Sequence, residues 1–223
     1  MRKSIIVALD EFNMDSCKNI LDKLDNNLCL VKIGSVAFNS LGHQIINEVS
    51  DRGFEIFLDL KFNDIPNTVS KSIFGIRNLP IKMLTVHISG GKEMLETSME
   101  AVKGKDIKIF GVSVLTSLNN KDTNTIFKRD ADKQVLSMLE IAEEAKIDGI
   151  VCSPHELEMV VDRKKFQTIT PGIRPYEFND DQSRVMTPKE AISLGADFIV
   201  IGRPITKSND IPKALEQVYQ SIL

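Results

Sequence analysis

The chain has 223 residues, of which 42% are hydrophobic and 26% are charged, and its formal net charge is −3. This composition is ordinary for a globular protein, and the slight acidity gives no indication of a nucleic-acid partner. The three cysteines, Cys17, Cys29 and Cys152, show no CxxC or other metal-ligand spacing, which favours a reducing compartment. The first apolar run is too short for a signal sequence or a membrane span. We therefore expect a soluble cytoplasmic protein without a membrane partner.

Short apolar runs alternate along the chain with longer segments of helical spacing. The predicted strands are Ile5–Leu9, Leu28–Ile33, Phe54–Leu60, Met83–Ile88, Ile107–Val114, Gly149–Cys152, Thr168–Thr170 and Phe198–Ile201. Continuous apolar runs are typical of parallel strands that are buried on both faces. The chain contains roughly eight β→α units, the number that a (β/α)8 TIM barrel requires. No linker or change of composition divides the chain, so we predict one TIM-barrel domain over residues 1–223.

The segments between the strands carry apolar stripes that predict helices. The stripes are Ile20, Leu21 and Leu24; Val36, Ile45, Ile46 and Val49 along a second helix; Leu136, Leu139, Ile141, Ala142 and Ala145; and Ala214, Val218 and Ile222. Two polar segments lack a clear pattern. Asn119–Asp132 is predicted as a mobile loop after the fifth strand, and Tyr176–Arg184 as a similar loop after the seventh.

Polar residues gather where the predicted strands end. They are Asp10, Lys32, Asp59, Lys61, His87, Ser113–Ser117, Arg174 and Arg203. A single charge at a strand end is often simply solvated, but unrelated surface charges would not favour one end so consistently. The carboxyl ends of the strands carry the active sites of TIM barrels, so the sequence predicts a functional site there.

The third strand has the most charged end, Asp59-Leu60-Lys61-Phe62-Asn63-Asp64. Because side chains alternate along a strand, we expect Asp59 and Lys61 to point to the same face. A charged pair at the end of a buried strand is costly unless it is paired or needed for function. The alternative to a catalytic pair is a structural network of ion pairs at the barrel mouth.

Gly172 and Gly202 follow the last two strands, where TIM barrels commonly bind phosphate. Glycine allows the backbone to approach an anion, Arg203 can add a forked hydrogen bond to phosphate oxygens, and Arg174 is placed to help. The alternative is that the two glycines form tight turns and that Arg203 lies on the surface.

Taken together, the motifs resemble the bacterial form of the orotidine 5'-phosphate decarboxylase family. The resemblance runs from the first strand to the last helix and includes Val7-Ala8-Leu9-Asp10, Val31-Lys32-Ile33-Gly34, Val86-His87-Ile88-Ser89-Gly90-Gly91, Val114-Leu115-Thr116-Ser117, Thr170-Pro171-Gly172-Ile173-Arg174-Pro175 and Val200-Ile201-Gly202-Arg203-Pro204-Ile205-Thr206. DxKxxD alone is shared with sugar-phosphate relatives, but its combination with IPNT, TPGIRP and IGRPIT is specific. Asn63 stands where many bacterial members carry His, which we expect to tune activity rather than abolish it.

The resemblance implies cofactor-free and metal-free decarboxylation of orotidine 5'-monophosphate (OMP) to UMP and CO2 in pyrimidine biosynthesis. It also implies a catalytic array of Lys32, Asp59, Lys61 and Asp64, in which two lysines and two aspartates balance each other's charge. Lys61 would stabilise the carbanion left at C6 when CO2 departs, and would protonate it.

The resemblance also implies binding roles. Asp10 and Lys32 would contact the ribose, and Thr116, with Ser117 as a rival, the pyrimidine. The implied phosphate contacts are Gln182, Gly202 and Arg203, with Arg174 nearby. The family is dimeric, and Asp64 and Thr68 would reach into the neighbouring subunit's site.

Two other functions stay open at this point. A metal-dependent relative, such as a gulonate-phosphate decarboxylase or a hexulose-phosphate synthase, places a carboxylate ligand on the second strand, where this chain has Lys32. A non-catalytic barrel that senses nucleotide phosphates is the second alternative, although the presence of all four array residues argues against a decayed site. His87 is better interpreted as a hydrogen-bonded support of the fourth strand than as a catalytic acid.

Overall fold

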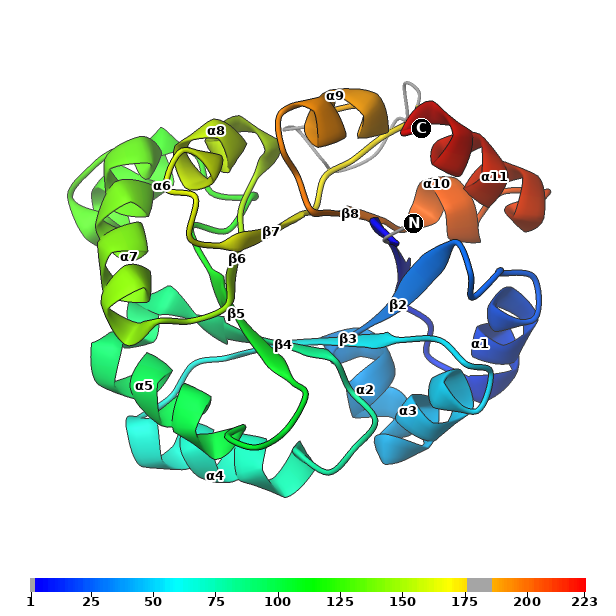
Figure 1. The fold of residues 1–223 in the computed structure, drawn as a ribbon, viewed down its shortest axis with the longest axis horizontal. Coiled ribbons are helices and arrows are strands. Elements are labelled where there is room, and N and C mark those ends of the chain that lie inside the picture. The colour runs from blue at the N-terminus through cyan, green and yellow to red at the C-terminus, as the bar shows by residue number, and fades with distance from the viewer. Residues whose placement is uncertain (1–2, 176–185) are drawn as a thin grey trace.

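The computed structural model describes residues 3–175 and 186–223. Eight parallel strands form a closed barrel in the order β1 to β8, seen end-on in Figure 1. They are β1 (Ile5–Leu9), β2 (Cys29–Gly34), β3 (Ile56–Phe62), β4 (Met83–His87), β5 (Lys108–Val112), β6 (Gly149–Val151), β7 (Gln167–Thr170) and β8 (Phe198–Ile201). The prediction of a single-domain TIM barrel is confirmed. β1 and β8 have the predicted bounds, and the other strands differ by one or two residues at one or both ends.

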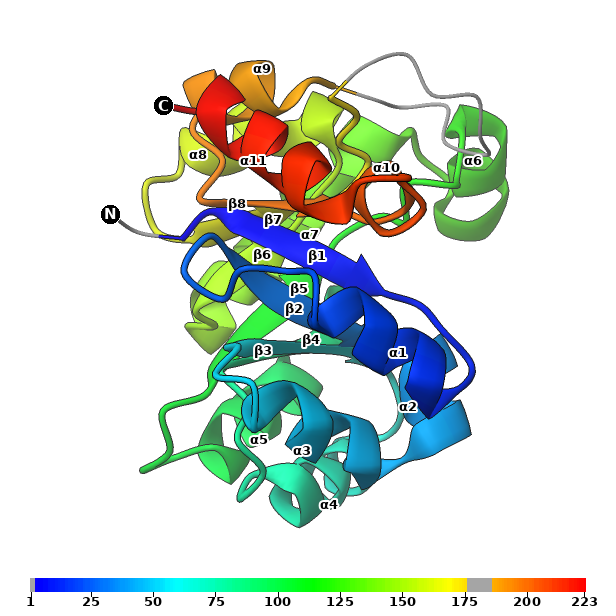
Figure 2. The same ribbon diagram turned by 90° about the vertical axis from the view of Figure 1, so that its right-hand side faces the viewer.

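The helices surround the ring of strands in Figure 1, and Figure 2 shows them from the side. They are α1 (Met14–Leu21), α2 (Ser35–Leu41), α3 (His43–Ser50), α4 (Pro66–Ile76), η1 (Ile88–Gly90), α5 (Lys92–Ala101), α6 (Asn120–Phe127), α7 (Ala131–Ala145), η2 (Pro154–Glu156), α8 (Leu157–Val161), α9 (Pro188–Ser193), α10 (Arg203–Thr206) and α11 (Ile211–Ser221). Within residues 3–175 and 186–223, no helix combines the length and the apolar character that crossing a bilayer requires.

The buried apolar side chains form two separate layers, as the alternation of side chains in a strand requires. The larger layer lies between the sheet and the helices. The smaller one fills the inside of the barrel and includes Phe57 and Phe110, whose ring centroids are 6.5 Å apart. Because this inner layer packs the barrel interior, the site at the carboxyl end of the strands has a closed apolar floor.

The prediction of one helix through Val36 and Val49 is wrong. Gly42 has a φ of 60°, in the left-handed region that glycine tolerates, and it separates α2 from α3. Val36 is 37% exposed and does not belong to the buried core, whereas Ile45, Ile46 and Val49 of α3 do.

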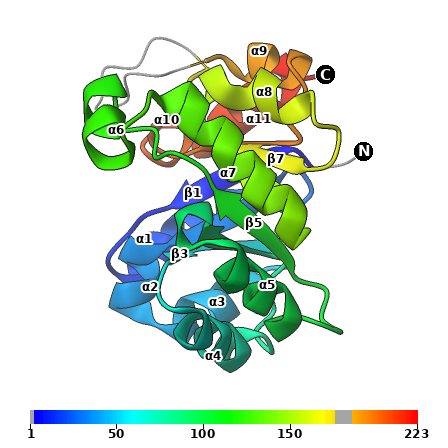
Figure 3. The ribbon, with the colours of Figure 1, turned by 90° about the vertical axis from the view of Figure 1, so that its left-hand side faces the viewer.

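The prediction of a loop over Asn119–Asp132 is also wrong, because this segment contains α6 and the start of α7. The Asn119 side chain accepts hydrogen bonds from the N–H groups of Lys121 and Asp122, and the Asp122 carboxylate accepts from Asn119 N–H. This reciprocal capping stabilises a helix that buries only Thr123, which explains why no apolar stripe is visible in the sequence. Figures 2 and 3 show α6 on the side of the barrel towards which β1 runs. The predicted loop Tyr176–Arg184 lies outside the described residues.

Candidate active site

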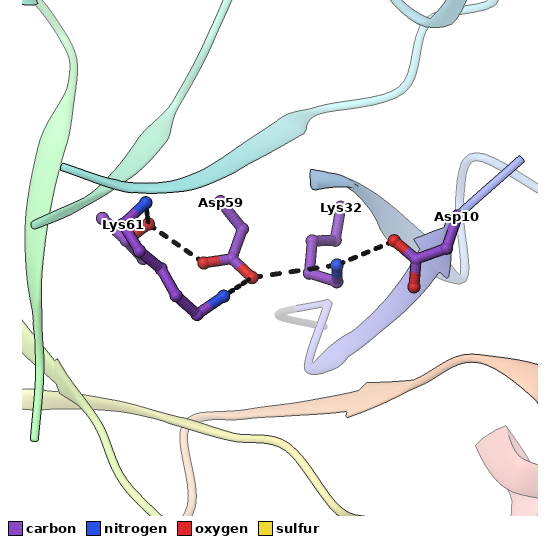
Figure 4. Close-up of polar contacts among 5 residues, drawn as sticks. Asp10, Lys32, Asp59 and Lys61 are labelled. Carbon is purple, nitrogen blue, oxygen red and sulfur yellow. Dashed lines mark hydrogen bonds and ion pairs between the residues drawn. The ribbon is translucent and has the colours of Figure 1, made fainter. Parts of the chain in front are cut away.

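Asp59 and Lys61 form a close ion pair at the carboxyl end of β3. Lys61 Nζ lies 2.6 Å from Asp59 Oδ2, and Figure 4 shows both side chains turned towards each other. The prediction that they face the same side is confirmed, but the strand between them is not regular. The pairing of β3 with β4 shifts between Leu58 and Phe62, and Lys61 has a φ of 51°. A bulge, rather than the ordinary pleat, therefore positions Lys61.

Lys32 connects this pair to Asp10. Its Nζ lies 3.7 Å from Asp59 Oδ2 and 3.2 Å from Asp10 Oδ1. The four side chains come from three adjacent strands, since β1 pairs with β2 and β2 with β3. Asp10, Lys32, Asp59 and Lys61 consequently form a row of alternating charge, which we call the charged row (Figure 4).

The Asp59 carboxylate is only 7% exposed but remains ionised. Burial opposes its charged form, yet the ammonium groups of Lys32 and Lys61, together with hydrogen bonds from Lys61 and Thr85, lower the pKa of Asp59 below its ordinary value of 3.8. Thr85 is a polar contact that the sequence interpretation missed. Thr85 lies two residues after Met83, an inner-core residue of the same strand, so alternation turns its side chain into the barrel, but only the structure shows which face of β4 is the inner one.

A cavity of about 270 Å³ opens beside the charged row at the carboxyl end of the barrel. Eight of the predicted site residues line it: Asp10, Lys32, Asp59, Lys61, Thr116, Arg174, Gly202 and Arg203. Ser117, the rival of Thr116, is not part of its described lining. Four cationic and two anionic side chains face the cavity, so it favours an anionic ligand. Its apolar floor includes Phe57, Val151 and Ile169 of the inner core.

The segments that follow β7 and β8 also line this cavity, and β8 pairs with β1, the strand that ends at Asp10. Gly172 has a φ of 80°, where a side chain would strain the backbone. Arg174 is 8% exposed, and its Nη1 donates to the Ile173 carbonyl at 2.9 Å. Gly202 directly precedes α10, which begins with Arg203. Two arginines, from the segments after the adjacent strands β7 and β8, thus line the cavity together with Gly172 and Gly202, where the backbone can approach a ligand. Gln182 lies outside the described residues.

Comparison with known proteins identifies the family of this barrel. A model of the orotidine 5'-phosphate decarboxylase / HUMPS family matches residues 3–218. The chain belongs to this family. Orotidine 5'-phosphate decarboxylase of Saccharophagus degradans is 41% identical over 220 residues, covering 96% of this chain and 92% of the relative. The enzyme of Legionella pneumophila (strain Lens) is 43% identical over 217 residues, covering 94% and 95%. The crystal structure of orotidine 5'-phosphate decarboxylase from Lactobacillus acidophilus matches with a TM-score of 0.86 at 33% identity, covering 99% of each chain.

Two residues that the resemblance to the orotidine 5'-phosphate decarboxylase family assigns to the site do not meet the others within this chain. Asp64 and Thr68 are exposed and are absent from the cavity lining. Asp64 Oδ1 accepts a hydrogen bond of 2.6 Å from Ile65 N–H, and Thr68 lies in the first turn of α4. Asn63, where many bacterial members of the family carry His, is also exposed.

His87 lies at the end of β4, half-buried, and is not among the described residues that line the cavity. Burial and then the nearby charge of Lys61 lower the pKa of His87, and Asp59 opposes them. A lowered pKa favours the neutral imidazole at physiological pH.

The other candidate ligating side chains are packing residues. Cys17, Cys29 and Cys152 are free and buried, and burial is the largest cause that raises the pKa of Cys17 to about 11 and that of Cys29 to about 12. In the part of the chain that the structure describes, no group of three or more His, Cys, Asp or Glu side chains is arranged to hold a metal ion.

Proposed function

We propose that this protein is an orotidine 5'-phosphate decarboxylase that converts OMP to UMP and CO2 in pyrimidine biosynthesis, in the cytoplasm and without a cofactor. The observation that carries the proposal is the charged row at the carboxyl end of the barrel strands, in a chain that belongs to this family. In this row, Lys61 Nζ lies 2.6 Å from the buried carboxylate of Asp59. Full-length relatives that are 41% and 43% identical and are named for this activity support it.

The substrate would lie across the cavity with its phosphate between the last two loops. Gly202 and Arg203, with Arg174 nearby and Gln182 from the preceding loop, are the proposed phosphate contacts. Asp10 and Lys32 would bind the ribose hydroxyls, and Thr116 would bind the pyrimidine above the apolar floor. This orientation brings C6 of the ring to Lys61. Binding energy from the remote phosphate would then hold the reacting carbon in place.

In the reaction, the bond between C6 and the carboxylate carbon breaks, CO2 leaves, and the electron pair stays on C6. The Lys61 ammonium stabilises this carbanion and donates a proton to C6, which forms UMP and a neutral amine. The amine then recovers a proton from water. Asp59 holds the Lys61 ammonium in place through the 2.6 Å contact, and we place it beside the substrate carboxylate, where like charges repel.

We further propose that the protein is a homodimer in which Asp64 and Thr68 complete the neighbouring subunit's site. Both side chains are exposed at the end of β3 and the start of α4, away from their own cavity. Ile65, beside Asp64, is 65% exposed, and Phe74 of α4 is 56% exposed, with the Arg77 guanidinium 3.7 Å above its ring. These apolar side chains would be covered if α4 and the preceding segment formed the subunit interface.

The two alternative functions make different predictions. In a metal-dependent relative, the second strand supplies a carboxylate ligand, but here Lys32 occupies that position and pairs with Asp10 and Asp59. A nucleotide sensor would bind OMP without turnover.

The deciding experiment follows the absorbance of OMP after mixing with the purified protein. We expect it to fall at a rate proportional to enzyme concentration and unchanged by EDTA. Lys61→Ala should abolish turnover while still binding UMP. Binding of OMP without turnover, substantial activity of Lys61→Ala, or EDTA-sensitive turnover of a sugar phosphate instead of OMP would contradict the proposal.

A further inference from the structure

Thr85, in the centre of β4, connects two members of the charged row through one hydroxyl group. Its Oγ1 donates a hydrogen bond to Asp59 Oδ1 at 3.0 Å and accepts one from the Lys61 backbone N–H at 2.9 Å. Thr85 is 0% exposed, so its hydroxyl makes these bonds away from solvent. The single hydroxyl therefore joins the carboxylate of one residue to the backbone of the other.

The bulge in β3 explains why a side chain makes these bonds. Leu58 pairs with Leu84, and the next pair is Phe62 with Val86, so three residues of β3 lie opposite Thr85 alone. The last of the three is Lys61, whose φ of 51° lies in a region that non-glycine residues rarely adopt. Such a conformation persists only where the surroundings hold it. The Thr85 hydroxyl bonds the N–H of this residue.

We propose that Thr85 is a positioning residue for decarboxylation: its hydroxyl holds the Lys61 backbone in the left-handed turn and orients the Asp59 carboxylate, so that Oδ2 faces Lys32 and Lys61. This inference rests on the proposed function. Valine has the shape of threonine but can make neither hydrogen bond. In Thr85→Val, the part-buried amide of Lys61 and the buried carboxylate of Asp59 each lose a partner, and the geometry of the pair that faces C6 loosens.

The Thr85 hydroxyl also favours the charged form of Asp59. The pKa of Asp59 therefore provides a second readout beside the kinetics. The other charged or titratable groups around this carboxylate are Lys32 of β2, Lys61 of β3 and His87 of β4, with Asp10 beyond Lys32. The substitution of Thr85 removes none of these groups. A rise in the pKa of Asp59 in Thr85→Val would therefore report the lost hydrogen bond together with the loosened Lys61 contact, and the proposal assigns both to Thr85.

The experiment compares Thr85→Val and Thr85→Ser with the matched control Thr168→Val. Thr168 is also buried, at 1% exposure, and its hydroxyl accepts from Asp197 N–H at 2.9 Å, but it does not line the cavity. For each variant, kcat and KM for OMP, the pH dependence of kcat/KM and the melting temperature are measured. The Asp59 carboxyl is titrated by 13C NMR in the ligand-free protein, with Asp59→Asn to assign its signal.

We expect Thr85→Val to lower kcat roughly 10- to 100-fold with a smaller effect on KM. The acidic limb of kcat/KM and the titration of Asp59 should both move to higher pH, because a hydrogen bond that favours the carboxylate is lost. Thr85→Ser should keep kcat and the titration of Asp59 close to the wild-type values. Thr168→Val should lower the melting temperature without changing kcat or the titration of Asp59. If Thr85→Val does not fold, Thr85→Ala carries the same expectations.

Wild-type kcat and an unmoved acidic limb in Thr85→Val would overturn the inference. A failure of serine to restore activity, or the same kinetic change in Thr168→Val, would overturn it as well. If the wild-type protein does not decarboxylate OMP, the proposed function fails, and the NMR titration still decides whether Thr85 controls Asp59.

Discussion

Lys61 Nζ lies 2.6 Å from Asp59 Oδ2, although only one residue separates them in the same strand. In a regular strand, residues two apart are about 7 Å from each other along the strand, with parallel side chains. The bulge opposite Thr85 and the φ of 51° at Lys61 change that geometry, so the two side chains converge (Figure 4). The shortest ion pair of the charged row therefore depends on a departure from regular strand structure.

Arg203→Ala should separate binding of the phosphate from binding of the nucleoside. We expect the Kd for UMP to rise about 10- to 100-fold, because a charge-assisted hydrogen bond to a dianion is lost, and the Kd for uridine to stay nearly the same. Calorimetric titration measures both. Lys207→Ala is the control, since Lys207 follows the same helix but pairs with Glu11 outside the cavity lining. Equal losses for the two ligands would show that Arg203 does not bind phosphate.

Mixing two inactive variants should restore activity if the sites are shared. A dimer of one Lys61→Ala subunit and one Asp64→Ala subunit contains one intact site, so random exchange should recover about a quarter of the wild-type activity in a two-fold symmetric dimer. Mixing Lys61→Ala with Asp59→Ala is the control. Both substitutions damage the subunit's own site, so no activity should return. Absence of recovery in the first mixture, with subunit exchange verified by mass, argues against shared sites.

Gly34→Ala should disturb Lys32 without unfolding the barrel. A Cβ at residue 34 would lie 2.8 Å from Lys32 Nζ and 3.1 Å from Asp10 Oδ1. Because Nζ is the end of a flexible side chain, we expect Lys32 to move away from Asp10. This displacement should lower kcat/KM by about tenfold. Since Gly34 is the N-cap of α2, the free energy of unfolding should change by about 1 kcal/mol. The control is Gly75→Ala in α4, where a Cβ meets nothing within 4 Å. An unchanged kcat/KM in Gly34→Ala would mean that the reaction does not depend on this position of Lys32.

Asp59 should make the folded protein less stable as the pH falls through the acidic range. Because its pKa is lowered in the folded state, its ionised form contributes stability above the ordinary value of 3.8, and this contribution is lost as pH falls through the folded pKa. We expect Asp59→Asn to be less stable than the wild type by about 1–3 kcal/mol at pH 7, at the lower end because the Lys61 side chain is 36% exposed. Urea unfolding at several pH values measures the difference, which should shrink below pH 4. A difference that stays constant down to pH 3 would exclude this linkage.

Some errors in the sequence interpretation have local physical causes. The helix α6 was missed because reciprocal capping by Asn119 and Asp122, rather than a buried apolar stripe, holds it. The break between α2 and α3 was missed because a single glycine at φ 60° interrupts a pattern that remains periodic on both sides. Thr85 was missed because a lone threonine in an apolar strand is ordinary until its partners are known.

The amino-acid sequence alone was sufficient for the barrel and for the family, and it predicted the candidate site at the carboxyl end of the strands. Buried parallel strands, strand-end charges and short motifs are local patterns, and such patterns are visible in the amino-acid sequence itself. Only the tertiary structure decided which charges touch. The charged row spans three strands, so its contacts depend on how those strands align and on the bulge opposite Thr85. The exposure of Asp64 and Thr68, outside their own cavity, depends in the same way on where the chain leaves the bulged strand, which no local pattern specifies.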